Sequence, residues 1–170
     1  MDVLDAIKER RSIRRFESID VEQDKLDKIL EAAKWAPSAG NLQARDIIVV
    51  RDKDTREKIA KAALSQGFIA DAPVVLVVCA NRKMSGSRYG LRGERLYCVQ
   101  DATAAIQNIL LSTFSLGLGS CWVGAFDDNR IREILNMPSE VDPVAIIPIG
   151  YPDETPLAPP RRSDVHEERW

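Results

Sequence analysis

One uncharged stretch, from Ala102 to Phe126, constrains the fold of this chain more than any other segment. Its apolar residues recur at three- and four-residue spacing, which predicts a buried helix from about Arg95 to Leu116. The apolar positions of that helix are Val99, Ala102, Ala105, Ile106, Ile109, Leu110 and Phe114. Polar side chains interrupt it, and two glycines end it before the length that a bilayer requires. We therefore expect a helix of the core or of a subunit interface, and no membrane span.

The segment that follows, from Gly119 to Phe126, is a short apolar run between glycines. Such a run is typical of a buried strand, and Gly124 within it indicates that the backbone approaches another group closely. A packed strand and turn without any ligand is the alternative interpretation.

The composition is that of an ordinary globular chain. Its 170 residues fit one domain, and 45% apolar with 29% charged residues shows no sign of disorder. A net charge of −2 excludes a global basic field for nucleic acid or an anionic membrane. The N-terminus has neither the cationic start nor the apolar core of a signal peptide, so we expect a soluble, cytoplasmic protein.

Cysteine and histidine are too few and too dispersed for a metal centre. The cysteines, Cys79, Cys98 and Cys121, lie far apart in apolar segments, which argues against disulfides and against a zinc knuckle. The one histidine, His166, lies in a polar tail and supports neither a metal cluster nor a catalytic triad. No Walker loop or nucleophile elbow occurs, and the glycines at 117 and 119 stand in the wrong order of elements for a dinucleotide fingerprint.

The densest positive charge lies near the start, in Arg10-Arg11-Ser12-Ile13-Arg14-Arg15-Phe16. Guanidinium groups bind phosphate bidentately, and the Ser12 hydroxyl adds an uncharged donor. The segment therefore predicts an anion-binding cradle, with a solvated basic turn as the alternative.

A loop of small and turn-forming residues, Pro37-Ser38-Ala39-Gly40-Asn41-Leu42-Gln43, places two side-chain amides before a predicted strand. Amides donate and accept at once, which suits the edge of a heterocycle such as a flavin. The alternative is that both amides satisfy the backbone of their own loop.

The remaining pattern alternates helices with strands. Helices are predicted with caps at Asp20, Asp54 and Asp128, and strands over Ile47–Val50, Val74–Ala80 and Val144–Tyr151. The absence of alternation in the second of these strands predicts that both of its faces are covered.

Two segments read as irregular. The basic, glycine-rich residues 81–94 predict a mobile loop, either a lid for an anionic substrate or pyridine nucleotide, or a solvated excursion. The proline-rich residues 152–170 predict an extended C-terminal tail of a single domain that spans residues 1–170.

Four segments together resemble the FMN-dependent nitroreductase family. They occur in the same order along the chain, and at the same spacing, as the corresponding motifs of that family. They are the arginine segment 10–16, the loop Ala36–Gln43, the run Gly117–Phe126 and Ile149-Gly150-Tyr151-Pro152. The resemblance implies an α+β fold with a mixed central sheet flanked by helices. It also implies a homodimer with FMN sites at the subunit interface, and the long buried helix as the dimer spine.

Site residues follow from the resemblance, position by position. Arg10, Ser12 and Arg11 would hold the FMN phosphate and ribityl chain, Arg14 would lie near the pyrimidine end of the ring, and Asn41 would bond the ring edge. Trp122, Val123 and Gly124 would lie against the flavin, with the Gly124 backbone N–H near N5, and Arg161 matches a C-terminal phosphate contact. No catalytic side chain is implied.

The chain departs from the family at two places. Pro159 stands where a lysine is common in the family, which leaves Arg162 to supply the missing positive charge. Gln43-Ala44-Arg45 stands where Gln-Pro-Trp is common. Both changes affect segments that the resemblance assigns to the cofactor site.

The implied activity is hydride transfer from NADH or NADPH through flavin N5 to an electron-poor acceptor such as a nitroaromatic or a quinone, with ping-pong kinetics. A flavin-binding module without turnover is one alternative, and a flavin-fragmenting or dehalogenating relative is another. A nucleic-acid binder that uses the arginines is a third, which the lack of interleaved exposed aromatics disfavours.

Overall fold

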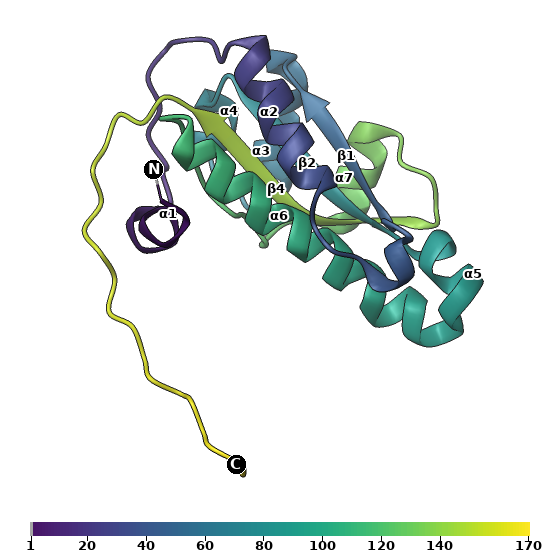
Figure 1. Ribbon diagram of the computed structural model, residues 1–170. Coiled ribbons are helices and arrows are strands. Elements are labelled where there is room, and N and C mark those ends of the chain that lie inside the picture. Colours follow the sequence, from purple (N-terminus) through teal and green to yellow (C-terminus); the bar gives the residue numbers. More distant parts are fainter. Residues whose placement is uncertain (1) are drawn as a thin grey trace.

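The computed structural model describes residues 2–170, which form an α+β fold around one four-stranded sheet (Figure 1). The strands are β1 (Arg45–Val50), β2 (Val74–Asn81), β3 (Gly119–Ser120) and β4 (Val141–Gly150), in the order β1-β2-β4-β3. The α-helices are α1 (Val3–Glu9), α2 (Gln23–Lys34), α3 (Lys53–Ala62), α4 (Phe68–Asp71), α5 (Arg82–Arg92), α6 (Cys98–Ser115) and α7 (Asp128–Leu135). A 3₁₀ turn, η1 (Ala39–Asn41), and a π-helical turn, η2 (Gly93–Tyr97), complete the elements.

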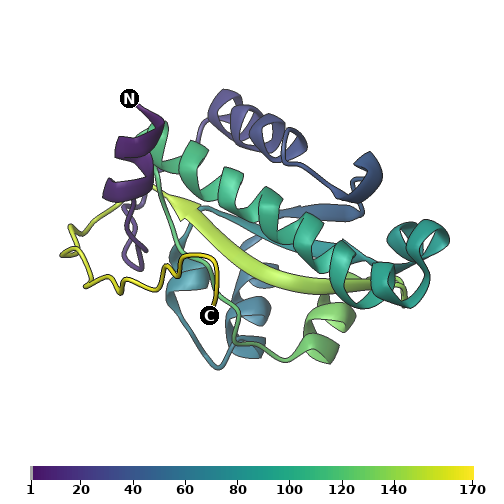
Figure 2. The same cartoon turned by 60° about the horizontal axis from the view of Figure 1, so that its bottom comes forward.

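Helices cover both faces of the sheet. Figure 2 shows α2 and α6 on one face and α3, α4 and α7 on the other. Strand β2 is buried on both sides, and its side chains alternate between two apolar clusters. Val74, Leu76, Val78 and Ala80 pack in the cluster with α2 and α6, whereas Val75, Val77 and Cys79 pack in the cluster with α3 and α7. The prediction that both faces of this strand are covered is therefore confirmed.

The predicted long helix is present. It comprises η2 and α6, and α5 ends at the residue before η2 begins. The first turn of α6 contains Asp101, a carboxylate that is only 3% exposed. That carboxylate accepts hydrogen bonds from the backbone N–H groups of Ala39 (3.0 Å) and Ala44 (3.3 Å), so the buried charge is satisfied and the amide loop is fixed to α6.

The expectation of a mixed sheet is wrong for this chain. Each pair of neighbouring strands in the described residues is antiparallel. Among the described residues, parallel pairing is limited to a single bridge between Ser12 and Ser120. A lone bridge arises because the arginine segment runs past the short β3 for only one residue pair.

The expectation of a mobile loop over residues 81–94 is also wrong, because this segment forms α5 and the start of η2. The Asn81 side chain caps α5 by accepting a hydrogen bond from Met84 N (3.0 Å). The glycines serve close packing. A Cβ at Gly93 would clash with Ser85 O, and one at Gly86 would lie 2.7 Å from Glu94 Oε1. Gly90, with φ of +54°, forms the kink inside α5.

Three predicted helix caps lie one to two residues from the observed ones. Helix α2 is preceded by Glu22 and not by Asp20, without a side-chain capping bond. The caps of α3 and α7 are Asp52 and Asp127, which accept from Thr55 N (2.8 Å) and Arg130 N (3.1 Å). For α3 and α7, two nearby aspartates compete for the same capping role.

The run from 119 to 126 is not one strand. Only Gly119 and Ser120 pair continuously with β4, and Val123 forms an isolated bridge to Ile146. Residues 153–170 contain no helix or strand. In the described part of the chain, every helix is too short or too polar to cross a membrane.

Candidate functional site

A cavity of about 360 Å³ gathers most of the predicted site residues. It lies between the arginine segment and the tail, and we call it the arginine cavity. Its lining residues are Arg10, Arg11, Ser12, Arg14, Pro156, Leu157, Pro159 and Arg161. Residues separated by about 150 positions in sequence therefore meet, as the prediction of a shared phosphate site requires. Arg162 does not line this cavity, so its predicted compensation for Pro159 is not seen there.

The backbone of the arginine segment is held against β3. Ile13 N donates to Ser120 O at 2.9 Å, beside the bridge that joins Ser12 to Ser120. Gly119 makes this approach possible, because a Cβ there would lie 2.8 Å from Ile13 Cγ1. The close packing places Ser12 at the cavity wall.

The tail is attached to the same segment through its first residues. The Glu154 carboxylate accepts hydrogen bonds from the backbone N–H groups of Arg14 and Arg15, and Arg15 Nη2 donates to Asp153 O at 2.7 Å. Sequence reasoning missed Glu154. Its signal would have been a tail carboxylate, adjacent to Asp153, that can reach a segment of four arginines, but sequence distance hides such a pairing.

Four cations in the arginine cavity lack a carboxylate partner. Among residues 2–170, none of the ion pairs involves Arg10, Arg11, Arg14 or Arg161. Burial lowers the pKa of Arg10, and the nearby charges of Arg161 and Arg11 lower it further, against an opposing effect of Cys121. Clustered, partly desolvated guanidinium groups are the arrangement that an anion stabilises.

A thiol lies beneath these arginines. Cys121 is 2% exposed, and burial raises its pKa, while Arg14, a hydrogen bond with Ser12 and Arg10 oppose that increase. A thiol held in its neutral form is a poor nucleophile, so Cys121 acts here as a packing residue.

A second, more apolar cavity of about 370 Å³ adjoins the arginine cavity and shares Arg10, Arg11 and Pro156 with it. It lies between α1, the carboxyl end of α6 and the start of the tail. Its other lining residues are Glu9, Ile13, Phe114, Gly117, Leu118, Gly119, Ser120, Pro152, Glu154 and Thr155.

The predicted flavin-contact residues 122–124 follow β3 directly. Val123 is 4% exposed and exchanges two backbone hydrogen bonds with Ile146, at 2.9 and 3.0 Å. Trp122 is 38% exposed, and a Cβ at Gly124 would meet only Trp122 Nε1, at 3.9 Å. The close neighbour that Gly124 predicts is therefore not provided by this chain, whose surface is open at that point.

Asn41, like residues 122–124, lines neither of these two cavities. Its loop is attached to Asp101 near the amino end of α6, whereas Phe114 at the carboxyl end lines the cavity beside Arg10. The rise of an α-helix places these two ends about 20 Å apart. Asn41 and the arginine cavity therefore occupy opposite ends of α6 within one chain.

The amide loop has an unusual backbone. Asn41 and Gln43 both have positive φ, at 56° and 54°, and Gly40 has φ of +56°. The Gln43 amide donates to Asn41 Oδ1 at 3.5 Å, and Gln43 N donates to Ser38 Oγ at 3.0 Å. The loop thus satisfies part of its own polar groups, and its left-handed residues hold the Asn41 amide in a fixed place.

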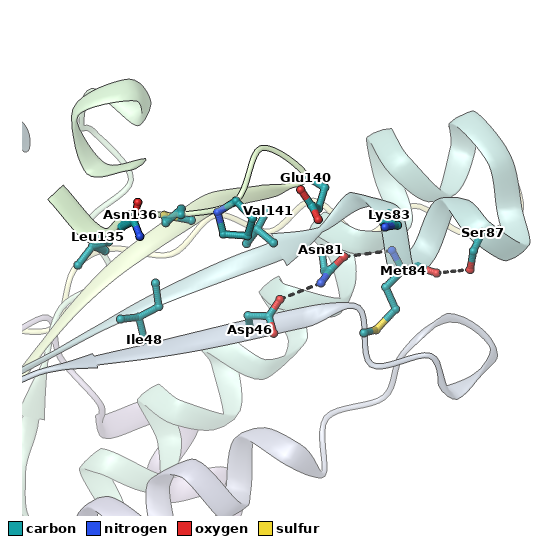
Figure 3. A pocket seen from close by; sticks show the side chains of 12 residues that line it. Asp46, Ile48, Asn81, Lys83, Met84, Ser87, Leu135, Asn136, Glu140 and Val141 are labelled. Carbon is teal, nitrogen blue, oxygen red and sulfur yellow. Dashed lines mark hydrogen bonds between the residues drawn. The ribbon is translucent and has the colours of Figure 1, made fainter. Parts of the chain in front are cut away.

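A larger cavity, of about 660 Å³, lies at the edge of β1, between the start of α5 and the turn after α7. Figure 3 shows that its polar groups bond one another. Asn81 Nδ2 donates to Asp46 Oδ2 at 3.0 Å, and Ser87 Oγ donates to Met84 O at 2.7 Å. None of the predicted site residues lines it, so we do not assign it to the reaction.

Comparison with known proteins places the chain in a family. The model of the nitroreductase family matches residues 7–67 and 63–151. A putative NADH dehydrogenase/NAD(P)H nitroreductase of Methanothermobacter thermautotrophicus is 39% identical over 100% of this chain and 88% of its own length. An FMN reductase [NAD(P)H] of Bacillus subtilis is 34% identical over 94% of this chain and 70% of its own length.

The fold agrees with the sequence comparison. The solved structure of an FMN-dependent nitroreductase from Clostridium difficile superposes with a TM-score of 0.83 and 32% identity, over 98% of this chain and 99% of that one. The nitroreductase-like fold expected from the sequence is thereby confirmed. The chain belongs to the nitroreductase family, and it is an enzyme of the oxidoreductase class.

Proposed function

We propose that this enzyme binds FMN and uses NADH or NADPH to reduce an electron-poor small molecule, such as a nitroaromatic or a quinone. The observation that carries the proposal is the arginine cavity, where four guanidinium groups without carboxylate partners meet the Ser12 hydroxyl. The names of its relatives support the choice of cofactor and coenzyme, since they include an FMN reductase [NAD(P)H] and an FMN-dependent nitroreductase.

The donor set of the cavity fits a phosphate monoester. Such a group has a charge of about −1.5 to −2 at neutral pH and several acceptor oxygens, which match forked guanidinium donors. Arg10, Arg11, Ser12 and Arg161 would hold it. Arg14, at the same wall, is a fixed cation that stabilises negative charge on the bound ligand.

The open backbone at Gly124 is the second feature that fits. A planar ring lies close to a main chain only where no side chain intervenes, and this chain leaves the space beyond Gly124 empty. When bound, FMN supplies the redox chemistry by accepting hydride at N5 from the coenzyme and donating it to the acceptor. The protein orients the ring and excludes water, and no protein acid or base is assigned.

We further propose a homodimer that completes the site. Helix α1 exposes Val3, Leu4 and Ile7 by 62%, 59% and 50%, and α6 has an uncharged outer side on which Val99 is 39% exposed. Two copies of α6 packed antiparallel would bring the amide loop of one copy to the arginine cavity of the other. This arrangement accounts for the position of Asn41 at the opposite end of the helix.

The test is an absorption spectrum of the purified protein, followed by anaerobic addition of NADH or NADPH and then of an acceptor. We expect the yellow spectrum of bound FMN, bleaching by the coenzyme and recovery of colour with p-benzoquinone or a nitroaromatic. Bound FMN that neither coenzyme bleaches would identify a non-catalytic flavin-binding module. A protein that does not bind added FMN would contradict the proposal.

A further inference from the structure

One strongly charged surface is not used by the site described above. It consists of Arg88 and Tyr89 on α5, Arg92 at the end of α5, and Tyr97 in η2, and we call it the arginine–tyrosine surface. It lies at the amino end of α6, and α5 lies at the opposite end of the molecule from α1 (Figures 1 and 2).

The surface is built from stacked pairs of cations and rings. The Arg88 guanidinium lies 5.5 Å from the centroid of Tyr89, and that of Arg92 lies 5.3 Å from the centroid of Tyr97. The two rings pack edge to face at 5.2 Å and 82°. Arg92 Nε also donates to Tyr97 Oη at 2.9 Å. Ring packing and this bond hold both arginines in defined positions.

The charge of this region is not compensated locally. Residues 82–95 contain five cations and one carboxylate, Glu94, in a chain whose net charge is −2. Within the described residues, the one ion pair made from this segment joins Arg82 to Asp142. Arg88 and Arg92 are both exposed and have no ion-pair partner there. Their remaining guanidinium donors are available to an anion.

The surface is continuous with the amide loop. A Cβ at Gly40 would touch the ends of the Tyr89 and Arg88 side chains, at 3.0 Å from Arg88 Nη1, and the φ of +56° at this position also favours glycine. The next residue is Asn41, and the loop is fixed to α6 by Asp101. A ligand that reaches the Asn41 amide therefore has Arg88 beside it.

We propose that the arginine–tyrosine surface binds the 2′-phosphoadenosine end of NADPH and so makes this enzyme prefer NADPH to NADH. The proposal rests on the proposed function, in which a nicotinamide coenzyme is the electron donor. An adenine ring stacks on tyrosine or guanidinium planes, and a 2′-phosphate takes forked hydrogen bonds from arginine. NADH has the same adenine but lacks that phosphate. Clustered aromatic and cationic groups fit a ligand that is both planar and phosphorylated better than a small anion.

The experiment compares the holoprotein with the double variant Arg88→Ala/Arg92→Ala. One measurement is calorimetric titration with 2′,5′-ADP and with 5′-AMP, and the other is the KM for NADPH and for NADH. We expect the double variant to bind 2′,5′-ADP at least about tenfold more weakly and to raise the KM for NADPH by a similar factor, as the loss of charged hydrogen bonds predicts. The KM for NADH and the affinity for 5′-AMP should change by less than about twofold.

A matched control removes two cations from another surface. Lys58→Ala/Lys61→Ala on α3 makes the same change in net charge near a shallow cavity on the other side of the sheet, and it should leave all four quantities unchanged. The variant Arg88→Lys/Arg92→Lys keeps the positive charges but loses the forked donors of the guanidinium groups. Its affinity for 2′,5′-ADP should lie between those of the double alanine variant and the wild type.

The results separate this proposal from the proposed function. A protein without FMN binding contradicts the proposed function, whereas the titration with 2′,5′-ADP still tests the surface. Equal affinity for 2′,5′-ADP in the wild type and the double variant would overturn the inference. A double variant that raises the KM of an anionic acceptor such as 4-nitrobenzoate, with the KM for NADPH unchanged, would also overturn it and assign the surface to the acceptor.

Discussion

Arg10 lines both the arginine cavity and the adjoining apolar cavity, and its charge is partly buried without a carboxylate partner. We expect Arg10→Ala to weaken FMN binding by at least about 1.5–3 kcal/mol, the range for a charged hydrogen bond. Fluorescence titration of the apoprotein with FMN at fixed salt measures the change. Arg130→Ala removes an exposed arginine of α7 and should leave the affinity unchanged. Equal affinities in Arg10→Ala and wild type would remove Arg10 from the site.

A substitution at Gly124 tests where the flavin ring of FMN binds, whereas Arg10→Ala tests where its phosphate binds. Because a Cβ at this position meets only Trp122 Nε1 at 3.9 Å, the folded chain itself has room for a larger side chain. We expect Gly124→Val to lower the FMN content per chain and to slow hydride transfer, with oligomer size and thermal unfolding nearly unchanged. Gly67→Val, where a Cβ would meet nothing within 4 Å, is the control. A Gly124→Val protein that binds and reduces FMN normally would show that the ring lies elsewhere.

At the scale of elements, Asp101 joins the amide loop to α6. Its carboxylate accepts from two backbone N–H groups, and one of them belongs to the fully buried Ala44. We expect Asp101→Ala to lower the free energy of unfolding by about 2–4 kcal/mol, because both donors lose a charged acceptor. Urea denaturation provides the measurement. Glu57→Ala on the exposed side of α3 should stay within about 0.5 kcal/mol of wild type. A similarly small change for Asp101→Ala would mean that the loop is held by other contacts.

Periodicity explains which elements could be predicted. The uncharged stretch predicts α6 because one face of that helix is buried against the sheet, and the continuous apolar run predicts β2 because both of its faces are covered. The segment 81–94 could not be predicted in this way. Glycine occurs both in flexible turns and where two segments pack closely. In α5 and η2 it serves close packing, which becomes visible only when the structure places Ser85 against Gly93 and Glu94 against Gly86.

The site was predictable to the extent that it is local in sequence. Four arginines in one segment favour an anion site by themselves, and three of them line a cavity together with Arg161. The position of Asn41 was not predictable, since sequence order does not state which end of α6 its loop contacts. The role of Glu154 was hidden for the same reason, because its partners are about 140 residues away.

At the scale of the whole molecule, the proposed homodimer makes α1 the element to test. We expect Leu4→Lys/Ile7→Lys to produce a monomer and to reduce FMN content, because charged side chains replace apolar ones that a second copy would cover. Sedimentation velocity together with the FMN absorbance measures both effects. Leu64→Lys changes another exposed leucine, 72% exposed in the turn after α3, and should leave the protein dimeric. A wild type that sediments as a monomer with full FMN content would contradict the dimer proposal.

The attachment of the tail at Glu154 has a consequence for how the arginine cavity retains an anion. Arg161 lies seven residues beyond that attachment, on a segment without helix or strand, so its guanidinium is a tethered ligand. Short tethers create effective concentrations on the order of millimolar, and Pro156, Pro159 and Pro160 stiffen this one. Free guanidinium should therefore replace a deleted Arg161 side chain only at millimolar concentrations or above. Each residue inserted between 154 and 161 should dilute this cation, so that the length of the tail adjusts the affinity of the cavity.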